Sequence, residues 1–152
     1  MLEAKPATAA DVPDLLGLVA QYWSFEGIAG FDAQRLSREL ERLCAQPHLG
    51  GAWISYVEHA PAGYVLSVYV FSLEHHGLTA EIDELFVLPK YRGRGLGAQL
   101  LRAAEAAARA AACSNISLQL GRHNDAARAF YRRHGYRVRA GYELLDKSLP
   151  AA

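Results

Sequence analysis

The residues whose types and spacing best suit chemistry lie in the run Arg-Gly-Arg-Gly-Leu-Gly-Ala at positions 92–98. Alternating glycines let the backbone approach a ligand closely, and their N–H groups add to those at the start of an alanine-rich helix. The side chains of Arg92 and Arg94 place positive charge beside the positive end of the helix dipole. We expect this turn to bind an anion, and a phosphate or pyrophosphate suits it best.

Two common phosphate-binding motifs fit the turn less well. A P-loop would end in Gly-Lys-Ser/Thr, which is absent here. Gly93-x-Gly95-x-x-Ala98 matches the permissive dinucleotide fingerprint, and Arg122 follows at roughly the distance where a 2′-phosphate is met. However, Pro89 to Arg92 separate the preceding strand from the first glycine, and the chain is too short for repeated βαβ halves. A nicotinamide-dependent oxidoreductase is therefore the weakest functional hypothesis.

The composition describes one small folded domain. With 152 residues, 51% of them hydrophobic, residues 1–152 can bury their own core. Sixteen basic residues balance sixteen acidic ones, so we expect no nucleic-acid partner. The N-terminus lacks signal-peptide features, and no apolar run reaches the ~18 residues of a membrane span, so we expect a cytoplasmic protein without a membrane partner. Cys44 and Cys113 lack metal spacing, and we expect no metal.

Hydrophobic periodicity predicts an α/β fold in the order β-α-α-β-β-β-α-β-α-β. Helical spacing recurs in four segments, at 9–23, 32–46, 96–112 and 125–134. Strand-like patterns occur in six segments, at 2–7, 52–58, 64–72, 79–88, 116–120 and 142–149. The strand at 79–88 leads into the glycine turn, and the helix at 96–112 leaves it, so these two elements position the anion site.

Two groups of residues resemble the motifs of a single enzyme family. Leu85-Phe86-Val87-x-Pro89-x-Tyr91, followed by Arg92-x-x-Gly95-x-Gly97, resembles the acetyl-coenzyme A signature of the GNAT superfamily of N-acetyltransferases. Asn124-Asp125-Ala126-Ala127, Phe130-Tyr131 and His134-Gly135-Tyr136 look like its second motif, Asn-x-x-Ala-x-x-Phe-Tyr-x-x-x-Gly-Phe/Tyr. The resemblance implies a mixed, mostly antiparallel sheet flanked by helices, and acetyl-CoA as co-substrate. Ala98 and Ala127 replace residues that are often Ser or Thr in the family.

The same resemblance implies where coenzyme A binds. The pantetheine arm would pair with the strand at Leu85 to Val87, and the pyrophosphate would lie on the N–H groups of residues 93–98. A backbone N–H near Leu85 or Phe86 would stabilise the oxyanion that forms on the acetyl carbonyl. The implied cofactor-binding residues are Leu85, Phe86, Val87, Arg92, Gly93, Arg94, Gly95, Leu96, Gly97, Ala98, Asn124 and Tyr131. Asn124 would contact the pantetheine or cap the following helix, and both roles can hold together.

Tyr131 matches the family tyrosine that lies near the sulfur. The resemblance implies that it is a general acid toward the departing thiolate, because a phenol is protonated at neutral pH. Its alternative role is only to pack against the coenzyme.

Three carboxylates on the strand before the glycine turn are candidates for the general base. Ile-Asp-Glu-Leu-Phe-Val resembles the corresponding strand of polyamine acetyltransferases, which makes Asp83 and Glu84 the matched pair. Plain alternation puts Glu81 and Asp83 on one face and Glu84 on the other, unless a bulge reverses the pattern. Glu84 or Asp83 is the favoured base and Glu81 is third. The alternative is a solvated sheet face.

The resemblance places the acceptor site on the first two helices, their connection and the strand before the glycine turn. The candidate residues are Tyr22, Trp23, Phe25, Glu26, Phe31 and the loop at His75 and His76. Aromatic and acidic side chains together favour a small cationic amine.

The leading hypothesis is an N-acetyltransferase that acetylates a primary amine of a small molecule by direct attack in a ternary complex. A protein or peptide acceptor, and a non-catalytic acyl-CoA sensor, are the alternatives. The resemblance also implies a possible homodimer.

Overall fold

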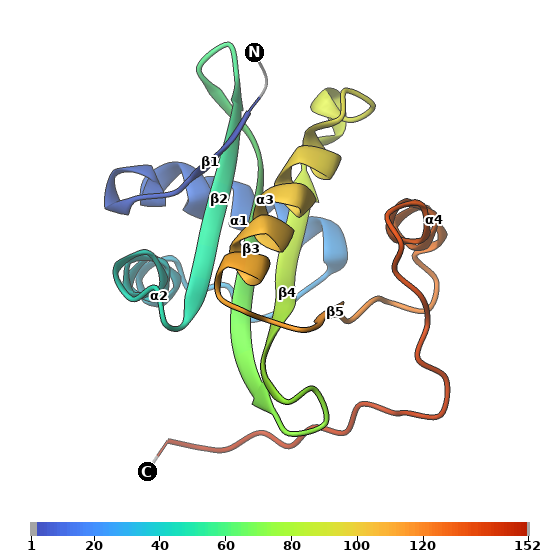
Figure 1. Ribbon diagram of the computed structural model, residues 1–152. Helices are drawn as coiled ribbons and strands as arrows, with labels where there is room; N and C mark the ends of the chain where they lie inside the picture. Colours follow the sequence, from blue (N-terminus) through green and yellow to red (C-terminus); the bar gives the residue numbers. More distant parts are fainter. Residues whose placement is uncertain (1–2, 152) are drawn as a thin grey trace. The chain divides into compact units, whose positions relative to one another are not determined.

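The computed structural model describes residues 3–151 (Figure 1). Its elements, in chain order, are β1 (Ala4–Pro6), the 3-10 helix η1 (Ala9–Asp11), α1 (Val12–Glu26), α2 (Ala33–Ala45), β2 (Gly50–Val57), β3 (Ala60–Ser72), β4 (Gly77–Val87), the 3-10 helix η2 (Pro89–Tyr91), α3 (Leu96–Ala110), β5 (Ile116–Leu118) and α4 (Asp125–Arg133). Tertiary contacts divide the chain into two units, one ending at Gln119 and one starting at Leu120. The sheet and α1 to α3 belong to the first unit, and α4 belongs to the second.

The sheet has five strands in the order β1-β2-β3-β4-β5. Neighbours from β1 to β4 are antiparallel, whereas β5 runs parallel to β4 after the crossover through α3. A parallel neighbour needs such a crossover, and a helix usually supplies it. The α/β class and the mixed, mostly antiparallel sheet predicted from the sequence are confirmed.

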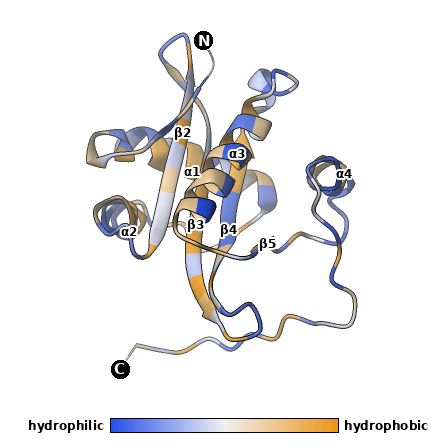
Figure 2. Ribbon diagram, viewed as in Figure 1, coloured by the Kyte–Doolittle hydropathy of each residue, from blue (hydrophilic) through white to orange (hydrophobic). Residues whose placement is uncertain are grey.

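Helices cover both faces of this sheet (Figure 1). One face packs on α1 and α2 through a buried apolar cluster, Val12, Leu15, Leu18, Val19, Leu40, Ala52, Ile54, Tyr64, Leu66, Phe86 and Leu88. The other face packs on α3, whose buried residues are Leu96, Leu100, Leu101, Ala104 and Ala108. Because β3 lies between both layers, its residues 62–67 are all buried. In Figure 2 a hydrophilic stretch interrupts the neighbouring strand β4.

Gly63 allows β3, β4 and α3 to pack closely. A Cβ at this position would lie 2.8 Å from the Phe86 carbonyl oxygen and 3.2 Å from Leu100 Cδ1. The first distance is too short for a carbon atom against backbone, so only glycine fits without displacing a neighbouring strand. The close approach holds α3 against the strand that leads into the glycine turn.

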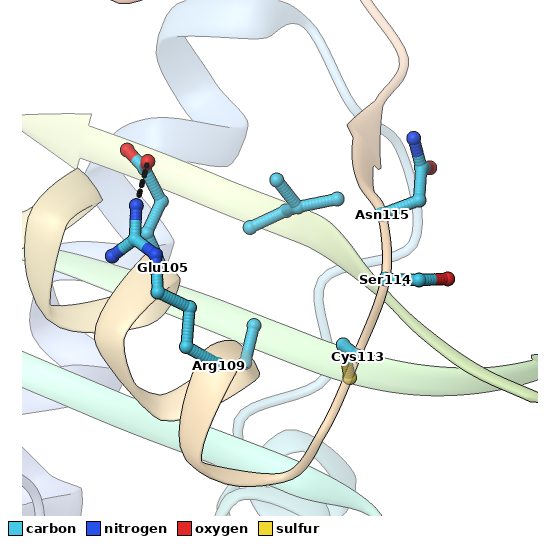
Figure 3. Close-up of a pocket in the computed structure, with 7 residues that line it drawn as sticks. Glu105, Arg109, Cys113, Ser114 and Asn115 are labelled. Carbon is cyan, nitrogen blue, oxygen red and sulfur yellow. Dashed lines mark ion pairs between the residues drawn. The ribbon is translucent and has the colours of Figure 1, made fainter.

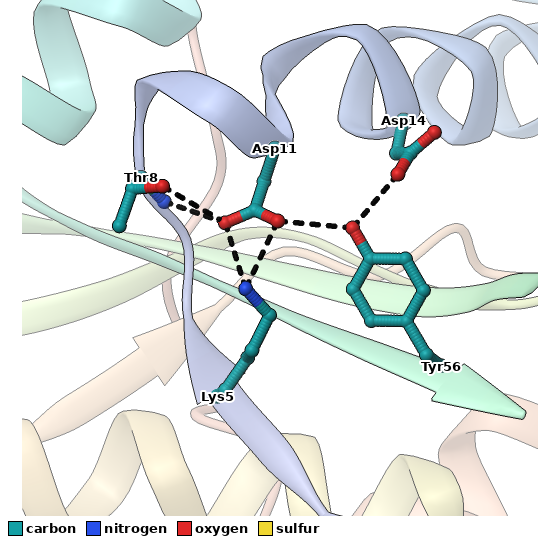
Figure 4. Close-up of polar contacts among 5 residues, drawn as sticks. All are labelled: Lys5, Thr8, Asp11, Asp14 and Tyr56. Atoms are coloured by element: carbon teal, nitrogen blue, oxygen red, sulfur yellow. Dashed lines mark hydrogen bonds and ion pairs between the residues drawn. The ribbon is translucent and has the colours of Figure 1, made fainter. Parts of the chain in front are cut away.

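A buried polar network fixes the N-terminal segment to the sheet (Figure 4). The Asp11 carboxylate accepts hydrogen bonds from Lys5 Nζ at 2.9 Å and from the Thr8 N–H at 2.9 Å. The Tyr56 hydroxyl lies 3.0 Å from Asp11 and 2.8 Å from Asp14. Burial alone would raise the pKa of Asp11, but the hydrogen bonds from Thr8, Lys5 and Tyr56 outweigh it and lower the pKa to about 2.

The predicted strand at 142–149 is absent. The segment is irregular and pairs with no strand among the described residues, and Tyr142, Leu144, Leu145 and Leu149 are exposed. A strand is stabilised by its pairing partner, and adjacent leucines at 144 and 145 give no one-sided pattern to bury. The strand predicted at 116–120 is likewise shorter, at Ile116–Leu118.

The other boundaries differ by a few residues. The first strand is Ala4–Pro6 rather than 2–7, and residue 2 lies outside the described residues. The first helix extends to Glu26 and ends where Gly27 adopts a left-handed φ of 69°. None of the helices between residues 3 and 151 combines the length and hydropathy needed to cross a membrane.

Candidate active site

The pairing of β3 with β4 is irregular where the carboxylates lie. Leu66 pairs with Glu84 and Ser67 pairs with Ile82, so Asp83 is an extra residue and forms a β-bulge. Glu81 lies opposite Val68, two residues from Leu66 on β3. The bulge therefore places Glu81 and Glu84 on the same face, the one covered by α1 and α2, in contrast to plain alternation.

Glu84 is held by two neutral donors. Trp23 Nε1 donates to Glu84 Oε2 at 2.8 Å, and the Tyr64 hydroxyl donates to Oε1 at 2.8 Å. Burial raises the pKa of Glu84, and the neighbouring Asp83 carboxyl raises it further, while the two hydrogen bonds lower it without cancelling the rise. A carboxyl group with a raised pKa is a better general base near neutral pH. Tyr64, which is fully buried, was not among the residues predicted for the site.

The other two candidate bases have different surroundings. Asp83 is exposed at the bulge, yet the neighbouring chain partly desolvates its carboxyl group and raises its pKa. Glu81 Oε1 accepts a hydrogen bond from Gln119 Nε2 at 3.3 Å, near the end of β5. Asp83 and Glu84 are therefore neighbours at the bulge. Glu81 lies on the same face as Glu84 but two positions further along β3, opposite Val68 rather than Leu66.

Aromatic side chains predicted for the acceptor site gather beside Glu84. The Tyr22 ring lies 5.3 Å from Phe86 and 6.4 Å from Tyr64, measured between ring centroids. Trp23 packs edge-on against Phe31 at 5.9 Å. Burial, with the negative charges of Glu26, Glu84 and Asp83, raises the pKa of Tyr22 to about 12. An aromatic surface surrounded by carboxylates attracts a cation, as expected for an ammonium group.

The histidine loop lies far from this cluster, so its predicted place at the acceptor site is wrong. His75 and His76 form the turn between β3 and β4, before β4 begins at Gly77. At about 3.3 Å per residue, the strand from Gly77 to Glu84 is roughly 20 Å long. The loop is instead tied to the end of α3, where the Ser114 hydroxyl donates to the His75 carbonyl at 2.6 Å.

The glycine turn has the geometry of an anion site. Gly93 and Gly95 adopt left-handed φ values of 76° and 83°, and a Cβ at either position would meet nothing within 4 Å. Gly95 is the N-cap of α3, and its carbonyl accepts the bond from the Gln99 N–H at 3.1 Å. The N–H groups at positions 96–98 thus belong to the first helical turn, which has no intrahelical acceptors. Side chains do not crowd these two glycines, and the binding of an anion at this turn stays a prediction.

The two arginines of the turn point to different neighbours. Arg92 Nε donates to the Val87 carbonyl at 2.9 Å, and its guanidinium lies 5.2 Å from the Phe25 ring and 5.5 Å from the Phe86 ring. It therefore ties the end of β4 to α1. Arg94 is exposed and lies 5.7 Å from the Tyr91 ring.

One edge of β4 is open next to the bulge. β5 pairs with β4 only from Ala80 to Ile82. On the side of β5, residues 83–87 have no strand partner in the described part of the chain. An unpaired edge presents backbone N–H and C=O groups to which an extended ligand can add.

Two predicted site residues lie in the second unit. Asn124 Oδ1 accepts a hydrogen bond from the Ala127 N–H at 3.2 Å, so it caps α4. Tyr131 is 9% exposed, and its ring packs 5.1 Å from Phe130 and 5.5 Å from Tyr136. The capping role proposed for Asn124 is thus present in this unit.

A shallow pocket lies at the other end of α3 (Figure 3). Glu105 and Arg109 form an ion pair of 3.6 Å beside it. Burial raises the pKa of Cys113 in its wall, which disfavours the reactive thiolate. Within residues 3–151, no group of three His, Cys, Asp or Glu side chains is placed to hold a metal ion.

Comparison with known proteins points to a single family. Residues 16–136 match the family model described as the acetyltransferase (GNAT) family. The uncharacterized N-acetyltransferase YhfO of Bacillus subtilis is 34% identical over 153 residues, which cover 98% of this chain and 97% of YhfO. An aminoalkylphosphonate N-acetyltransferase of Salmonella typhimurium is 42% identical over 67 residues, or 44% of each chain. The chain spans about half the length of this relative and of an uncharacterized Archaeoglobus fulgidus N-acetyltransferase, with 44% and 56% covered.

Solved structures have the same fold. An integron cassette protein from the Cole Harbour Salt Marsh metagenome superposes with a TM-score of 0.86 at 25% identity, covering 99% of this chain and 92% of that one. An aminoglycoside N-acetyltransferase in complex with CoA gives a TM-score of 0.84 at 16% identity, covering 98% and 96%. The second likeness concerns the fold alone. The extent of the family match, and the full-length likeness to YhfO, show that this chain belongs to the acetyltransferase (GNAT) family.

Proposed function

We propose that residues 1–152 act as one N-acetyltransferase domain that transfers an acetyl group from acetyl-CoA to a primary amine of a small molecule. The observation that carries this proposal is Glu84. It is a half-buried carboxylate with a raised pKa, surrounded by aromatic rings, on the strand that leads into an open anion-binding turn. This arrangement supports a base, a cation-attracting surface and a phosphate site along one strand and the start of one helix.

Each chemical step has a candidate group in the chain. Acetyl-CoA supplies a thioester, whose carbonyl carbon the amine attacks directly and whose C–S bond then breaks. Glu84 or Asp83 takes the proton that the ammonium group loses, directly or through water. A backbone N–H near Leu85 or Phe86 donates to the oxyanion. Tyr131 gives its proton to the departing thiolate. The second proton, which the attacking nitrogen loses as the C–S bond breaks, restores the Tyr131 hydroxyl through water. The products are the amide, the free thiol and one proton on the carboxylate.

We place coenzyme A along the open edge of β4 and on the glycine turn. The edge at Leu85 to Val87 suits the amides of pantetheine, because both can pair as strands do. The N–H groups of residues 93–98 and the exposed Arg94 suit the pyrophosphate. Arg92 contributes its backbone and its charge to the same turn. From the family resemblance we also propose that Asn124 and Tyr131 contact the coenzyme.

The acceptor is the least constrained part of the proposal. The Salmonella typhimurium relative acts, by its name, on aminoalkylphosphonates, which are small amines. A protein or peptide acceptor is the second candidate, and a non-catalytic acyl-CoA sensor is the third. From the family resemblance we also propose a homodimer that works in the cytoplasm.

Calorimetric titration with acetyl-CoA tests the cofactor site. We expect saturable binding that Arg94→Glu weakens at least tenfold, because the new carboxylate repels the pyrophosphate. Arg102→Glu makes the same charge change on the exposed side of α3 and is the matched control. No binding by folded wild-type protein would contradict the proposal.

An amine panel with detection of free thiol then tests the reaction. Acetylation of peptides alone, seen by mass spectrometry of a peptide library, would favour the second candidate. The sensor would be favoured if the protein bound acetyl-CoA but no amine in the panel caused release of free thiol, and if Tyr131→Phe left this behaviour unchanged.

A further inference from the structure

The Glu84 carboxylate is fixed from two elements that are distant in sequence. The donor to Oε2 is Trp23, near the end of α1, and the donor to Oε1 is Tyr64, near the start of β3. Tyr64 is 0% exposed, so its ring cannot turn away without breaking core packing. Trp23 is half-buried and held edge-on by Phe31. The carboxylate therefore has one orientation, set by two rigid side chains.

The chemistry of the donors decides which state of the carboxyl group they favour. An indole N–H can only donate, so Oε2 must supply a lone pair to it. The tyrosine hydroxyl also donates, and a hydrogen bond to the charged form stabilises that form. Each carboxylate oxygen keeps a second lone pair, which is free to accept a proton or a water molecule. The two bonds thus orient the group without blocking it.

We propose that Trp23 and Tyr64 are positioning residues for Glu84, which aim its carboxylate at the acceptor amine. This inference rests on the proposed function. The other group that acts on the carboxylate is Asp83 on the same strand. Tyr22 on α1 faces the same cluster, where burial and the charges of Glu26, Glu84 and Asp83 raise its pKa. Arg92 lies over the Phe86 ring, two residues along β4.

These neighbours give the inference a definite sign. Burial and Asp83 raise the pKa of Glu84, and the bonds from Tyr64 and Trp23 lower it. Removing either donor therefore raises the pKa further. Removing the Asp83 charge lowers it. A hydrogen bond to a charged group is worth enough to shift a titration by about one pH unit.

Fluorescence of Trp23 tests the inference without any substrate. The chain has two tryptophans, so Trp53→Phe leaves Trp23 as the only indole and serves as the reference protein. We expect Trp23 emission to titrate with pH, because its N–H bonds the group that ionises. Glu84→Gln should abolish the transition, Tyr64→Phe should move it up by about one pH unit, and Asp83→Asn should move it down. A transition that Glu84→Gln preserves, or that Tyr64→Phe leaves in place, overturns the inference.

The pH dependence of kcat/KM separates positioning from a purely structural role. In the profile of kcat/KM against pH, activity falls on the acidic side as the base becomes protonated. Tyr64→Phe and Trp23→Phe should move this acidic limb of the profile to higher pH by about one unit. Tyr56→Phe is the matched control, because it removes a hydroxyl beside Asp11 and Asp14 in the N-terminal network. It should lower stability and leave the limb in place. Activity lost equally at every pH in Tyr64→Phe would show that the residue only supports the fold.

The two readouts distinguish failure of the inference from failure of the proposed function. If Trp23 emission titrates as expected but no amine is acetylated, the proposed function is wrong, and the inference that Trp23 and Tyr64 position Glu84 stands. If amines are acetylated and neither the emission nor the limb responds to Tyr64→Phe, the function stands and the inference is wrong.

Discussion

Asp11 and Glu84 each lie within hydrogen-bonding distance of a tyrosine hydroxyl, and their surroundings shift their pKa values in opposite directions. The Asp11 carboxylate also accepts hydrogen bonds from the Lys5 ammonium and the Thr8 backbone N–H, and its pKa falls to about 2. Burial raises the pKa of Glu84, the neighbouring Asp83 raises it further, and the two neutral donors, a tyrosine hydroxyl and an indole N–H, do not cancel the rise. The hydrogen bonds from the Thr8 N–H and the Lys5 ammonium favour the ionised form of Asp11, which joins β1, η1 and β2. Among the described residues, Glu84 has neither a backbone N–H nor a cation as donor, so its protonated form is favoured instead.

The largest expected effect separates these roles by activity. Glu84→Gln keeps the shape of the side chain and removes its ability to take a proton, so kcat should fall by about 10²–10³-fold. Steady-state kinetics at saturating substrates measures this loss. Glu81→Gln changes a carboxylate on the same face of β4 and is the control variant. If Glu81→Gln lost this activity and Glu84→Gln kept it, Glu81 would be the general base.

Asp11→Asn should show the reverse pattern. It leaves Lys5 without its partner and removes the charge that the network is built around, so the free energy of unfolding should fall by about 3 kcal/mol. The kcat of the folded fraction should not change. Urea denaturation followed by circular dichroism measures the stability, and an unchanged midpoint would mean that the network contributes little.

The two groups should also differ in how stability depends on pH. For Asp11 the folded pKa is lowered from 3.8 to about 2, so its contribution is complete above pH 3.8. That contribution, about 2 kcal/mol, is lost as the pH falls through the folded value. Urea titrations from pH 7 to pH 2 should show wild type losing its advantage over Asp11→Asn in this window. A constant difference between the two proteins would contradict the lowered pKa.

Glu84 should give the opposite slope. Its folded pKa is raised, so its favourable contribution is complete below its ordinary pKa and is lost as the pH rises through the folded value. The stability of wild type relative to Glu84→Gln should therefore decline between acidic and neutral pH. The same urea titrations measure it, and a rising difference would show that the ionised carboxylate is stabilised by folding.

The smallest effect concerns the tyrosine of the N-terminal network. Tyr56→Phe removes one neutral hydroxyl while Lys5 and Thr8 remain on Asp11, so it should cost about 1 kcal/mol. Thermal unfolding followed by circular dichroism checks it. A loss as large as that of Asp11→Asn would show that the hydroxyl, rather than the lysine, holds the network.

The elements around the anion site could be predicted because their signals are local. Glycines, a proline and a run of alanines specify the break and the helix, and the two ends of β4 and α3 lie within a few residues of the predicted positions. The final strand could not be predicted in this way. The residues at 142–149 have a strand-like composition, but pairing decides whether a strand forms.

The base and its partners depended on contacts that no local pattern records. Trp23 is 61 positions from Glu84 and Tyr64 is 20 positions away. Tyr64 gave one weak signal, as a polar hydroxyl in a strand that is buried on both faces. The sequence could not decide whether a bulge is present, because a bulge depends on the register between two strands rather than on either strand alone.

The extra residue at Asp83 changes which residues of β4 face α1 and α2. Before it, the odd-numbered Glu81 faces α1 and α2, and after it the even-numbered Glu84 and Phe86 do. Removing Asp83 would keep both halves in their present register, because Ile82 would still lie opposite Ser67 and Glu84 opposite Leu66 as neighbours in a regular strand. Glu81, Glu84 and Phe86 would stay on the face of α1 and α2, and the local bend of the bulge would be lost. A single-codon deletion at this point would therefore straighten the strand and leave the order of its two faces unchanged.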